Sequence, residues 1–194
     1  MVQPDKFTLC LRLRTLTGGG WLHLSWHPLA ARVAVGAPPQ RGDAAEAFSF
    51  AEQASAALRG LVLTGAAMPQ PWERVAALSF GTRPGDPPRH QLMCEVMGRY
   101  SNVVLTSEPG AAVLAAAFQV GGAMSSLRQV QQGRAYELPP IVAGVPPSAE
   151  EPLARWRDNV TRAAALAAAA AAAPPPEKRR PALGARRSPG SSPP

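Results

Sequence analysis

The sequence contains few of the residues that most catalytic and metal sites require. Its 194 residues include two cysteines and three histidines, and neither cysteine lies in a CxxC or other metal-ligand spacing. A Gly-rich phosphate loop, an HExxH motif and a G-x-S-x-G nucleophile motif are also absent from the sequence. We therefore expect no enzymatic activity, no cofactor and no bound metal, and we interpret Cys10 and Cys94, within strand-like runs, as packed thiols.

The sequence also lacks a long hydrophobic segment. Its longest apolar run, residues 163–173, is short and consists mostly of alanine, so it does not predict a membrane span. The first six residues have neither the basic nor the apolar region of a signal peptide. We expect a cytoplasmic protein that has no membrane contact and no small-molecule substrate.

Acidic residues are outnumbered, and the excess of positive charge lies mainly at one end. The net charge is +7, of which residues 174–194 supply +4, with five basic residues and one acidic residue. The basic character therefore belongs mostly to this Pro/Arg/Ser-rich tail, which we expect to be disordered. The remaining +3 is too small to establish nucleic-acid binding by the folded part.

The first predicted unit is a β-hairpin over residues 8–26. Leu9, Leu11 and Leu13 alternate with Cys10 and basic residues, and a second alternating run follows the glycines at 18–20. Such alternation on both sides of glycines is typical of two paired strands with one apolar face. Two histidines, His23 and His27, would point the same way on the second strand, but no carboxylate or thiol pattern completes a metal site.

The rest of the body predicts more short strands and one or two helices. Residues 49–52 have the S-x-x-E spacing of a capping box, and apolar residues recur at helical spacing up to a glycine stop at Gly60. Strands are expected at 32–35, 61–63 and 75–80, and residues 111–120 fit either a helix or a strand. The prediction is an α+β domain built on antiparallel sheet.

Residues 94–105 carry the most informative pattern. Two apolar, β-prone segments, 92–97 and 103–105, flank a five-residue loop of sequence Gly98-Arg99-Tyr100-Ser101-Asn102. This spacing predicts a hairpin that holds polar side chains at a sheet edge. The loop could bind a ligand or partner, or its Asn and Ser side chains could bond only the local backbone. We interpret Gly98, Ser101 and Asn102 as mainly structural and leave Arg99 open to an RNA or protein contact.

The sequence of this hairpin resembles the E-(L/I/V)-M-G-(R/K)-x-S-N-(I/V)-(I/V)-L signature of the N-terminal domain of the NFACT family, which includes RqcH-like and Nemf-like proteins. Further segments resemble family motifs in the same order, over roughly residues 3 to 160. They are Gln3, Leu9 to Thr15, Pro38-Pro39, Phe48-Ser49-Phe50, Leu58-Arg59-Gly60, Trp72-Glu73-Arg74-Val75, Ser126-Leu127-Arg128, Gly133, Tyr136 and Pro139-Pro140.

The resemblance implies a non-catalytic RNA-binding domain. NFACT proteins act in ribosome-associated quality control: they bind large ribosomal subunits that carry stalled peptidyl-tRNA, engage tRNA and drive C-terminal tailing of the stalled peptide. The family's Asp-Arg pair, tied to tRNA engagement, corresponds here to Glu73 and Arg74. Arg99 and Arg128 are further candidates for contact with tRNA or ribosomal RNA. Arg74 can instead be a strand-edge residue paired with Glu73 or solvent.

The same resemblance extends to a fold similar to the N-terminal domain of formamidopyrimidine-DNA glycosylases. Those enzymes attack through an N-terminal proline followed by glutamate, whereas this chain begins Met1-Val2-Gln3, so glycosylase activity is not expected. Since the family's leading helical segment is missing, a truncated N-terminus and a lost chloroplast transit peptide stay open.

Three regions are predicted: an NFACT-N-like domain over 1–147, a helix that begins the next region over 148–173, and the tail over 174–194. The family's coiled coil and NFACT-R domain have no counterpart, so ribosome rescue by this chain alone is not expected. The alternative reading is a structural remnant or protein-interaction module that has lost the ribosomal function.

Overall fold

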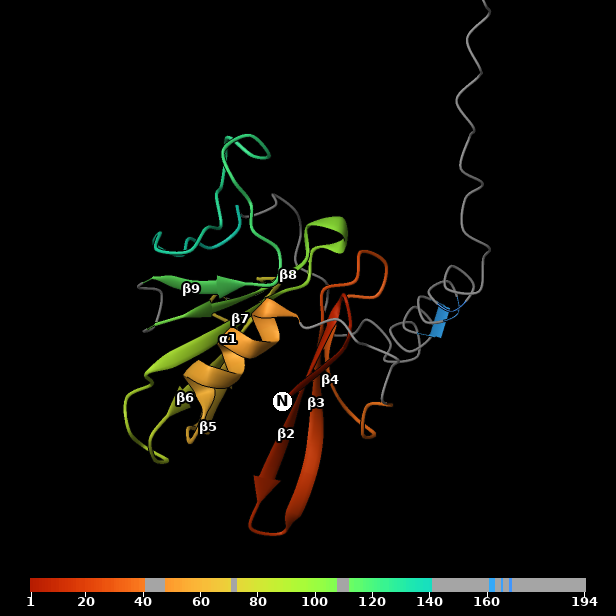
Figure 1. The fold of residues 1–194 in the computed structure, drawn as a ribbon, viewed down its shortest axis with the longest axis vertical. Helices are drawn as coiled ribbons and strands as arrows, with labels where there is room; N and C mark the ends of the chain where they lie inside the picture. Colours follow the sequence, from red (N-terminus) through yellow and green to blue (C-terminus); the bar gives the residue numbers. More distant parts are fainter. Residues whose placement is uncertain are drawn as a thin grey trace, which may run out of the picture.

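The computed structural model describes residues 1–40, 48–70, 73–107 and 112–140, together with residues 161, 162, 165 and 168. Two antiparallel sheets stand side by side, and helix α1 lies beside both of them (Figure 1). The predicted α+β class with antiparallel sheet is confirmed. The tail over 174–194 and the boundary at 147 lie outside the described residues, and of the helix expected over 148–173 the four described residues are helical.

The first sheet has four strands in sequential order, and the predicted hairpin forms its centre. The strands are β1 (Val2–Asp5), β2 (Thr8–Thr15), β3 (Gly18–Ser25) and β4 (Arg32–Gly36). Leu9 lies opposite Leu24 and Leu11 opposite Leu22, so the alternating leucines share the inner face. The turn consists of Leu16 and Thr17 and so precedes the glycines that were expected to form it. Gly18 to Gly20 instead pair with β2 as part of β3.

Helix α1 (Ser49–Leu58) begins where the sequence predicted, but it does so without the expected capping box. The N-cap is Phe48 and no side chain caps the first turn. Ser49 is already inside the helix, and Glu52 uses its backbone N–H to donate to the Phe48 carbonyl at 3.3 Å. The predicted stop at Gly60 is confirmed, since this residue has a left-handed φ of 76°.

The second sheet has five strands, again in sequential order. The strands are β5 (Val62–Ala67), β6 (Val75–Gly81), β7 (His90–Glu95), β8 (Asn102–Thr106) and β9 (Val113–Ala116), and the 3₁₀ turn η1 (Gly98–Tyr100) joins β7 to β8. Strand β5 runs past Gly65 to Ala67, beyond the predicted 61–63, with a bulge between Leu63 and Gly65. The ambiguous segment 111–120 contains a strand, because its alanines pair with β8.

The second sheet is buried on both faces. One face joins the inner leucines of the first sheet, Trp26 and the buried face of α1 in the main core. The other face carries Val75, Met93 and Val104, which pack with Val130 and Tyr136 from the segment that follows β9. Burial on both faces explains why β7 and β8 are hydrophobic in continuous runs rather than in alternation.

The segment that follows β9 covers the outer face of the second sheet with little regular structure. Val120 and Val130 exchange backbone hydrogen bonds of 2.9 Å in both directions. In Figure 1 this segment rises at the same end of the second sheet as η1, where strand β8 begins. Among the described residues, we find no helix with the length and hydrophobicity that crossing a membrane requires.

Candidate functional site

A hollow of about 870 Å³ opens at this end of the second sheet. Its lining includes Arg74, Arg99, Asn102 and Arg128, four of the residues proposed from the sequence, from segments separated by up to 54 positions. Glu73 precedes Arg74 in the chain and is not among the lining residues. The fold therefore gathers the three candidate arginines at one concave surface.

Arg74 stands immediately before β6 and is exposed. Its carbonyl accepts a hydrogen bond from the Val96 N–H at 2.8 Å, which ties it to the end of β7. Its own N–H donates to Glu73 Oε1 at 2.7 Å. The Glu73 carboxylate therefore holds the backbone of Arg74, and the guanidinium forms no ion pair within the described residues.

The loop between β7 and β8 presents Arg99 and Tyr100 to solvent. Gly98 has a left-handed φ of 58°, and the Met97 N–H donates to Ser101 Oγ at 2.8 Å, so the turn is fixed at both ends. Arg99 Nη2 donates to Tyr100 Oη at 2.6 Å, and its guanidinium carbon lies 4.7 Å from the centre of the Tyr100 ring. The two side chains form one exposed cation–π unit.

Asn102 acts as a buried clamp between β8 and the segment after β9. Its side chain, 2 % exposed, donates from Nδ2 to the Phe118 carbonyl at 2.7 Å. Its Oδ1 accepts the Phe118 N–H at 2.9 Å and the Val103 N–H at 3.0 Å. Asn102 thereby fixes the backbone that places Phe118 in the wall of the hollow.

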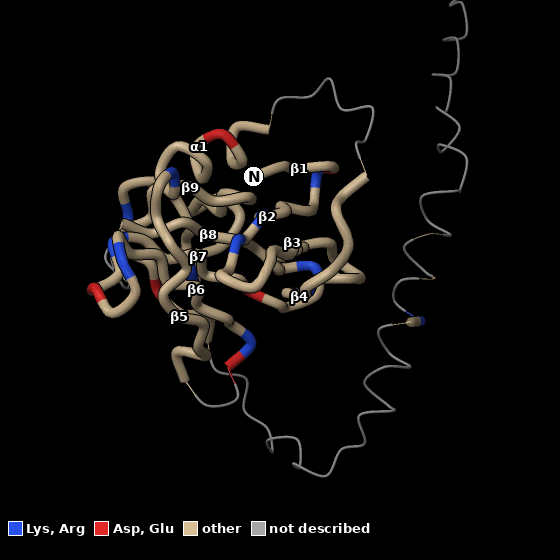
Figure 2. Tube along the Cα trace, turned by 90° about the horizontal axis from the view of Figure 1, so that it is seen from below, with Lys and Arg blue, Asp and Glu red and all other residues tan. Residues whose placement is uncertain are grey.

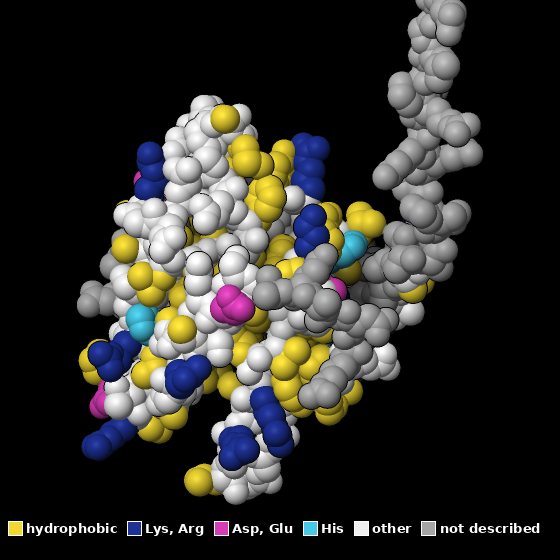
Figure 3. Space-filling model, viewed as in Figure 1, with side chains coloured by type: hydrophobic (Ala, Val, Ile, Leu, Met, Phe, Trp, Pro, Cys, Tyr) yellow, Lys and Arg dark blue, Asp and Glu magenta, His cyan; other side chains and the backbone are white. Residues whose placement is uncertain are grey.

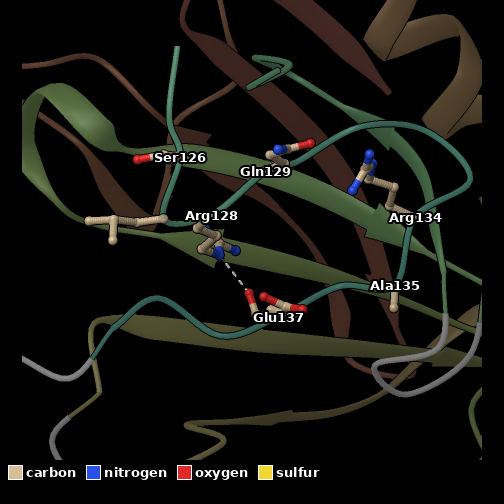
Figure 4. Close-up of a pocket in the computed structure, with 7 residues that line it drawn as sticks. Ser126, Arg128, Gln129, Arg134, Ala135 and Glu137 are labelled. Carbon is tan, nitrogen blue, oxygen red and sulfur yellow. Dashed lines mark hydrogen bonds between the residues drawn. The ribbon is translucent and has the colours of Figure 1, made fainter. Parts of the chain in front are cut away.

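Arg128 is held inside the protein rather than extended into solvent. Its Nη2 and Nη1 donate to Glu95 Oε1 and Oε2 at 2.5 and 3.2 Å, and Tyr136 Oη donates to Glu95 Oε1 at 2.8 Å. Arg128 Nε also donates to the Glu137 carbonyl at 2.7 Å, the contact drawn in Figure 4 on the edge of a second, smaller hollow. Sequence reasoning missed this network, because nothing in the spacing links Glu95 to Arg128.

Burial and charge act together on the network. Glu95 is 2 % exposed. Burial alone lowers the pKa of Arg128, but the hydrogen bond and the charge of Glu95 outweigh it and raise that pKa. Burial raises the pKa of Tyr136, and the neighbouring Glu95 carboxylate raises it further. Tyr136 is buried, with 8 % of its surface exposed.

The wall of the hollow between the arginines is largely apolar. Phe118, Met124 and Leu127 are 52 %, 61 % and 86 % exposed, and Tyr100 is 66 % exposed. Figure 3 shows hydrophobic side chains gathered toward the top of the molecule, with basic side chains on both sides. Exposed apolar and aromatic side chains framed by arginines are typical of a binding surface.

The described residues contain no group of three or more His, Cys, Asp or Glu side chains that could hold a metal ion. His23 donates from Nε2 to the Ala37 carbonyl at 2.8 Å, and its Nδ1 lies 3.3 Å from Cys10 Sγ. His27 accepts the Leu29 N–H at 3.2 Å. Both cysteines are free and buried, which confirms the prediction of packed thiols.

Comparison with known proteins assigns the chain to a family. The family model for NFACT N-terminal and middle domains matches residues 1–170. The chain belongs to the NFACT family. The resemblance drawn from the 94–105 hairpin is therefore confirmed. Two of the signature residues, Glu95 and Asn102, line the hollow, and Gly98 and Ser101 shape the turn beside it.

Solved structures share the NFACT fold. The N-terminal part of the fibronectin/fibrinogen-binding protein of Streptococcus suis has a TM-score of 0.64 at 22 % identity, over 74 % of this chain and 54 % of that one. The N-terminal domain of fibronectin-binding protein PavA of Streptococcus pneumoniae has a TM-score of 0.64 at 21 % identity, over 82 % and 62 %. The fibrinogen-binding protein of Staphylococcus aureus has a TM-score of 0.57 at 23 % identity, over 72 % and 48 %.

These matches support the fold and no more, because their identity to this chain is low. The alignments span about half of the first two neighbouring chains, 54 % and 48 %. No curated protein matches the chain.

Proposed function

We propose that this NFACT chain is the non-catalytic RNA-binding domain of a ribosome-associated quality-control factor and that it binds tRNA at the hollow beside η1. In this role it would engage large ribosomal subunits carrying a stalled peptidyl-tRNA and support C-terminal tailing. The observation that carries the proposal is the convergence of Arg74, Arg99 and Arg128 on one hollow with exposed aromatic side chains.

The chemistry of the rim suits a phosphate backbone. Arg74 and Arg99 are exposed and form no ion pair within the described part of the chain. A guanidinium presents N–H groups in a fork that matches two phosphate oxygens. Contacts to phosphate position an RNA without reading its sequence, so these two arginines would supply affinity rather than base selectivity.

Arg128 contributes differently from the other two arginines. Three of its five N–H groups are engaged by Glu95 and by the Glu137 carbonyl, and its charge is paired with Glu95. Arg128 still lines the hollow, and an RNA contact by this residue stays a prediction. The proposal places the main weight on Arg74, whose guanidinium is free of such bonds among the described residues.

The test is tRNA affinity of the full chain as a function of salt, measured by fluorescence anisotropy with labelled tRNA. Because residues 174–194 are basic, all variants also carry glutamine at Lys178, Arg179, Arg180, Arg186 and Arg187. We expect Arg74→Ala to weaken binding about tenfold. The salt slope, which is the change of log affinity with log salt concentration, should become less steep by about 1, because one phosphate contact is lost. Arg83→Ala, an exposed arginine outside the hollow, is the matched control and should change little.

Equal affinities for the parent and Arg74→Ala would contradict the proposal. They would favour the alternative, a protein-interaction module that kept the fold and lost the ribosomal role. The exposed apolar wall supports that alternative, since Met124 and Leu127 are more than half exposed. A Leu127→Ser variant separates the two, because it would weaken an apolar protein contact while leaving phosphate contacts at Arg74 in place.

A further inference from the structure

The first sheet carries a basic outer face that the hollow does not include. Residues 1–40 contain four basic side chains and one acidic side chain, a net charge of +3. This equals the whole net charge of the chain outside residues 174–194. Figure 2 marks these Lys and Arg positions among strands β1 to β4. The excess positive charge of the folded part is therefore concentrated on one sheet.

The strand register shows which of these side chains share a face. Arg12 lies opposite Trp21, and Arg14 follows two residues later on the same side of β2. Leu11 and Leu22 point to the other side, into the core. Two residues along a strand span about 7 Å, so Arg12 and Arg14 form a short basic row beside the indole of Trp21.

Arg32 extends this face across β3 and β4. It lies opposite Ser25, which pairs in turn with Thr8. The charges of both Arg32 and Asp5 act on Cys10, which points to the same side. Asp5 is the acidic residue of this region, and it sits opposite Thr8 at the end of the sheet away from Arg14.

The exposed part of the face lies toward the tip of the β2–β3 hairpin. Thr8, Cys10 and Ser25 are buried, whereas Arg12 and Arg14 are exposed and Trp21 is half-buried. Arg32 is also exposed, but it lies at the other end of the sheet, opposite Ser25, and its Nη1 donates to the Ala30 carbonyl at 2.8 Å. At the turn Leu16 is fully exposed, and Figure 3 shows basic side chains on this projecting hairpin at the bottom of the view. Arg12 and Arg14 form no ion pair within the described residues.

Trp21 is half-buried, and its neighbours on this face are Gly36 on β4 and His23 on β3. Gly36 lies opposite Trp21 on β4 and adds no side chain beside it. The His23 ring leans over Gly36, because it donates to the Ala37 carbonyl at 2.8 Å. His23 is therefore occupied in holding β4, and the exposed part of the indole, Arg12 and Arg14 remain as the groups available for binding at this end of the sheet.

We propose that the outer face of the first sheet near the tip of the β2–β3 hairpin, formed by Arg12, Arg14 and Trp21, is a second RNA-binding surface for a single-stranded segment, with Arg32 extending it toward the other end of the sheet. The arginines bind phosphates, and the Trp21 indole gives an unpaired base a surface on which to stack. An RNA strand is favoured over an acidic polypeptide because phosphates can use the arginines and an unpaired base can use the indole. The inference shares only its ligand class with the proposed tRNA site.

The test measures binding of a 20-nucleotide poly(U) strand to the full chain with the same five glutamines in residues 174–194. We expect Arg12→Gln/Arg14→Gln to weaken binding about tenfold and to lower the salt slope by about 1.4, since two single-strand contacts are lost. Arg83→Gln/Arg89→Gln removes the same charge from exposed positions between β6 and β7 and should weaken binding less than twofold. An equal loss in this control would mean a net-charge effect only and would overturn the inference.

A second arm tests the stacking role of Trp21. Trp21→Leu should weaken poly(U) binding several-fold and leave binding of inorganic polyphosphate of matched charge unchanged. Circular dichroism and a thermal melt establish that each variant is folded. If Trp21→Leu weakens both ligands equally, or if polyglutamate displaces poly(U) at equal charge concentration, the surface does not recognise RNA and the inference fails.

The two RNA surfaces are distinguished by crossing the variants. If Arg74→Ala leaves tRNA affinity unchanged while Arg12→Gln/Arg14→Gln reduces poly(U) affinity, the proposed tRNA hollow fails and the sheet surface stands. If Arg74→Ala reduces tRNA affinity and Arg12→Gln/Arg14→Gln changes neither ligand, the hollow stands and the sheet surface fails.

Discussion

Arg128 binds Glu95 through both carboxylate oxygens, at 2.5 and 3.2 Å, and so joins two segments that lie 33 residues apart in the sequence. Glu95 ends strand β7 of the second sheet, whereas Arg128 belongs to the irregular segment that covers its outer face. Both side chains of the ion pair are largely buried, since Arg128 is 13 % exposed and Glu95 is 1 % exposed. Both residues line the hollow, so the ion pair joins two parts of its lining.

Removing one partner of this pair should destabilise the fold. We expect Arg128→Met to lower the free energy of unfolding by about 3–5 kcal/mol, because the Glu95 carboxylate would stay buried without its counter-charge. Urea denaturation monitored by circular dichroism measures the change. Arg134→Met, at an exposed position nearby, should stay within about 0.5 kcal/mol. The double variant Glu95→Gln/Arg128→Met should cost less than Arg128→Met alone, and a larger cost would contradict this account.

Tyr136 should make stability depend on alkaline pH. Burial, and then Glu95, raise the pKa of Tyr136 in the folded state, while an unfolded tyrosine ionises near pH 10. Above about pH 10 the unfolded state therefore loses this proton while the folded state keeps it. The contribution of Tyr136 to the free energy of unfolding is complete below about pH 10 and declines as pH rises further. Tyr136→Phe should lose that alkaline decline and cost about 1–3 kcal/mol at pH 7 through the missing hydrogen bond.

Unfolding curves at pH 8 and pH 11 for the parent and Tyr136→Phe measure the decline. The difference in stability between the two proteins should shrink at the higher pH. A difference that is constant across this range would show that Tyr136 does not titrate differently in the two states.

The two thiols should be inert in the native protein. Cys10 and Cys94 are 0 % and 2 % exposed, and burial is the main cause that raises the pKa of each thiol. Because the thiolate is the reactive form, a disulfide reagent at pH 8 should label neither cysteine until urea is added. Labelling of two thiols in urea gives the reference value. Rapid labelling of the native protein would contradict the described packing.

Asn102 should be sensitive to an isosteric change. Asn102→Asp keeps the oxygen that accepts from Phe118 and Val103, but it replaces the Nδ2 donor that faces the Phe118 carbonyl. We expect a loss of about 1–3 kcal/mol in unfolding free energy, since two oxygens would then face each other in a buried site. Gln132→Glu, a comparable change at an exposed position, is the control. Equal melting temperatures for Asn102→Asp and the parent would rule out the clamp.

Local patterns predicted the elements whose side chains repeat with a simple period. The leucines at 9, 11 and 13 predicted β2 because one face of that strand is buried and the other carries polar or basic residues. Residues 111–120 stayed ambiguous, since alanine favours a helix while pairing with β8, a tertiary effect, makes Ala115 and Ala116 part of a strand. The S-x-x-E pattern at 49–52 forms no capping box, because the helix starts at Ser49 itself and its N-cap is therefore Phe48.

The candidate site was predictable as a set of residues but not as a shape. The family motifs pointed to Arg74, Arg99 and Arg128, and the fold brings all three to one hollow. Sequence spacing could not show that Arg128 pairs with Glu95, since such contacts depend on how distant segments fold together. The basic face of the first sheet follows from strand register, which the alternation of Arg12 and Arg14 with leucines had already indicated.

The irregular segment over the second sheet sets a lower limit on how far this domain can be shortened. A fragment that ended with β9 would keep both sheets and α1, yet Val75, Met93 and Val104 would lose the cover that Val130 and Tyr136 provide. Such a fragment would present a flat hydrophobic sheet to water and would be prone to self-association. We therefore expect the smallest unit that retains the fold to include the chain through Tyr136, although the last strand among the described residues ends at Ala116.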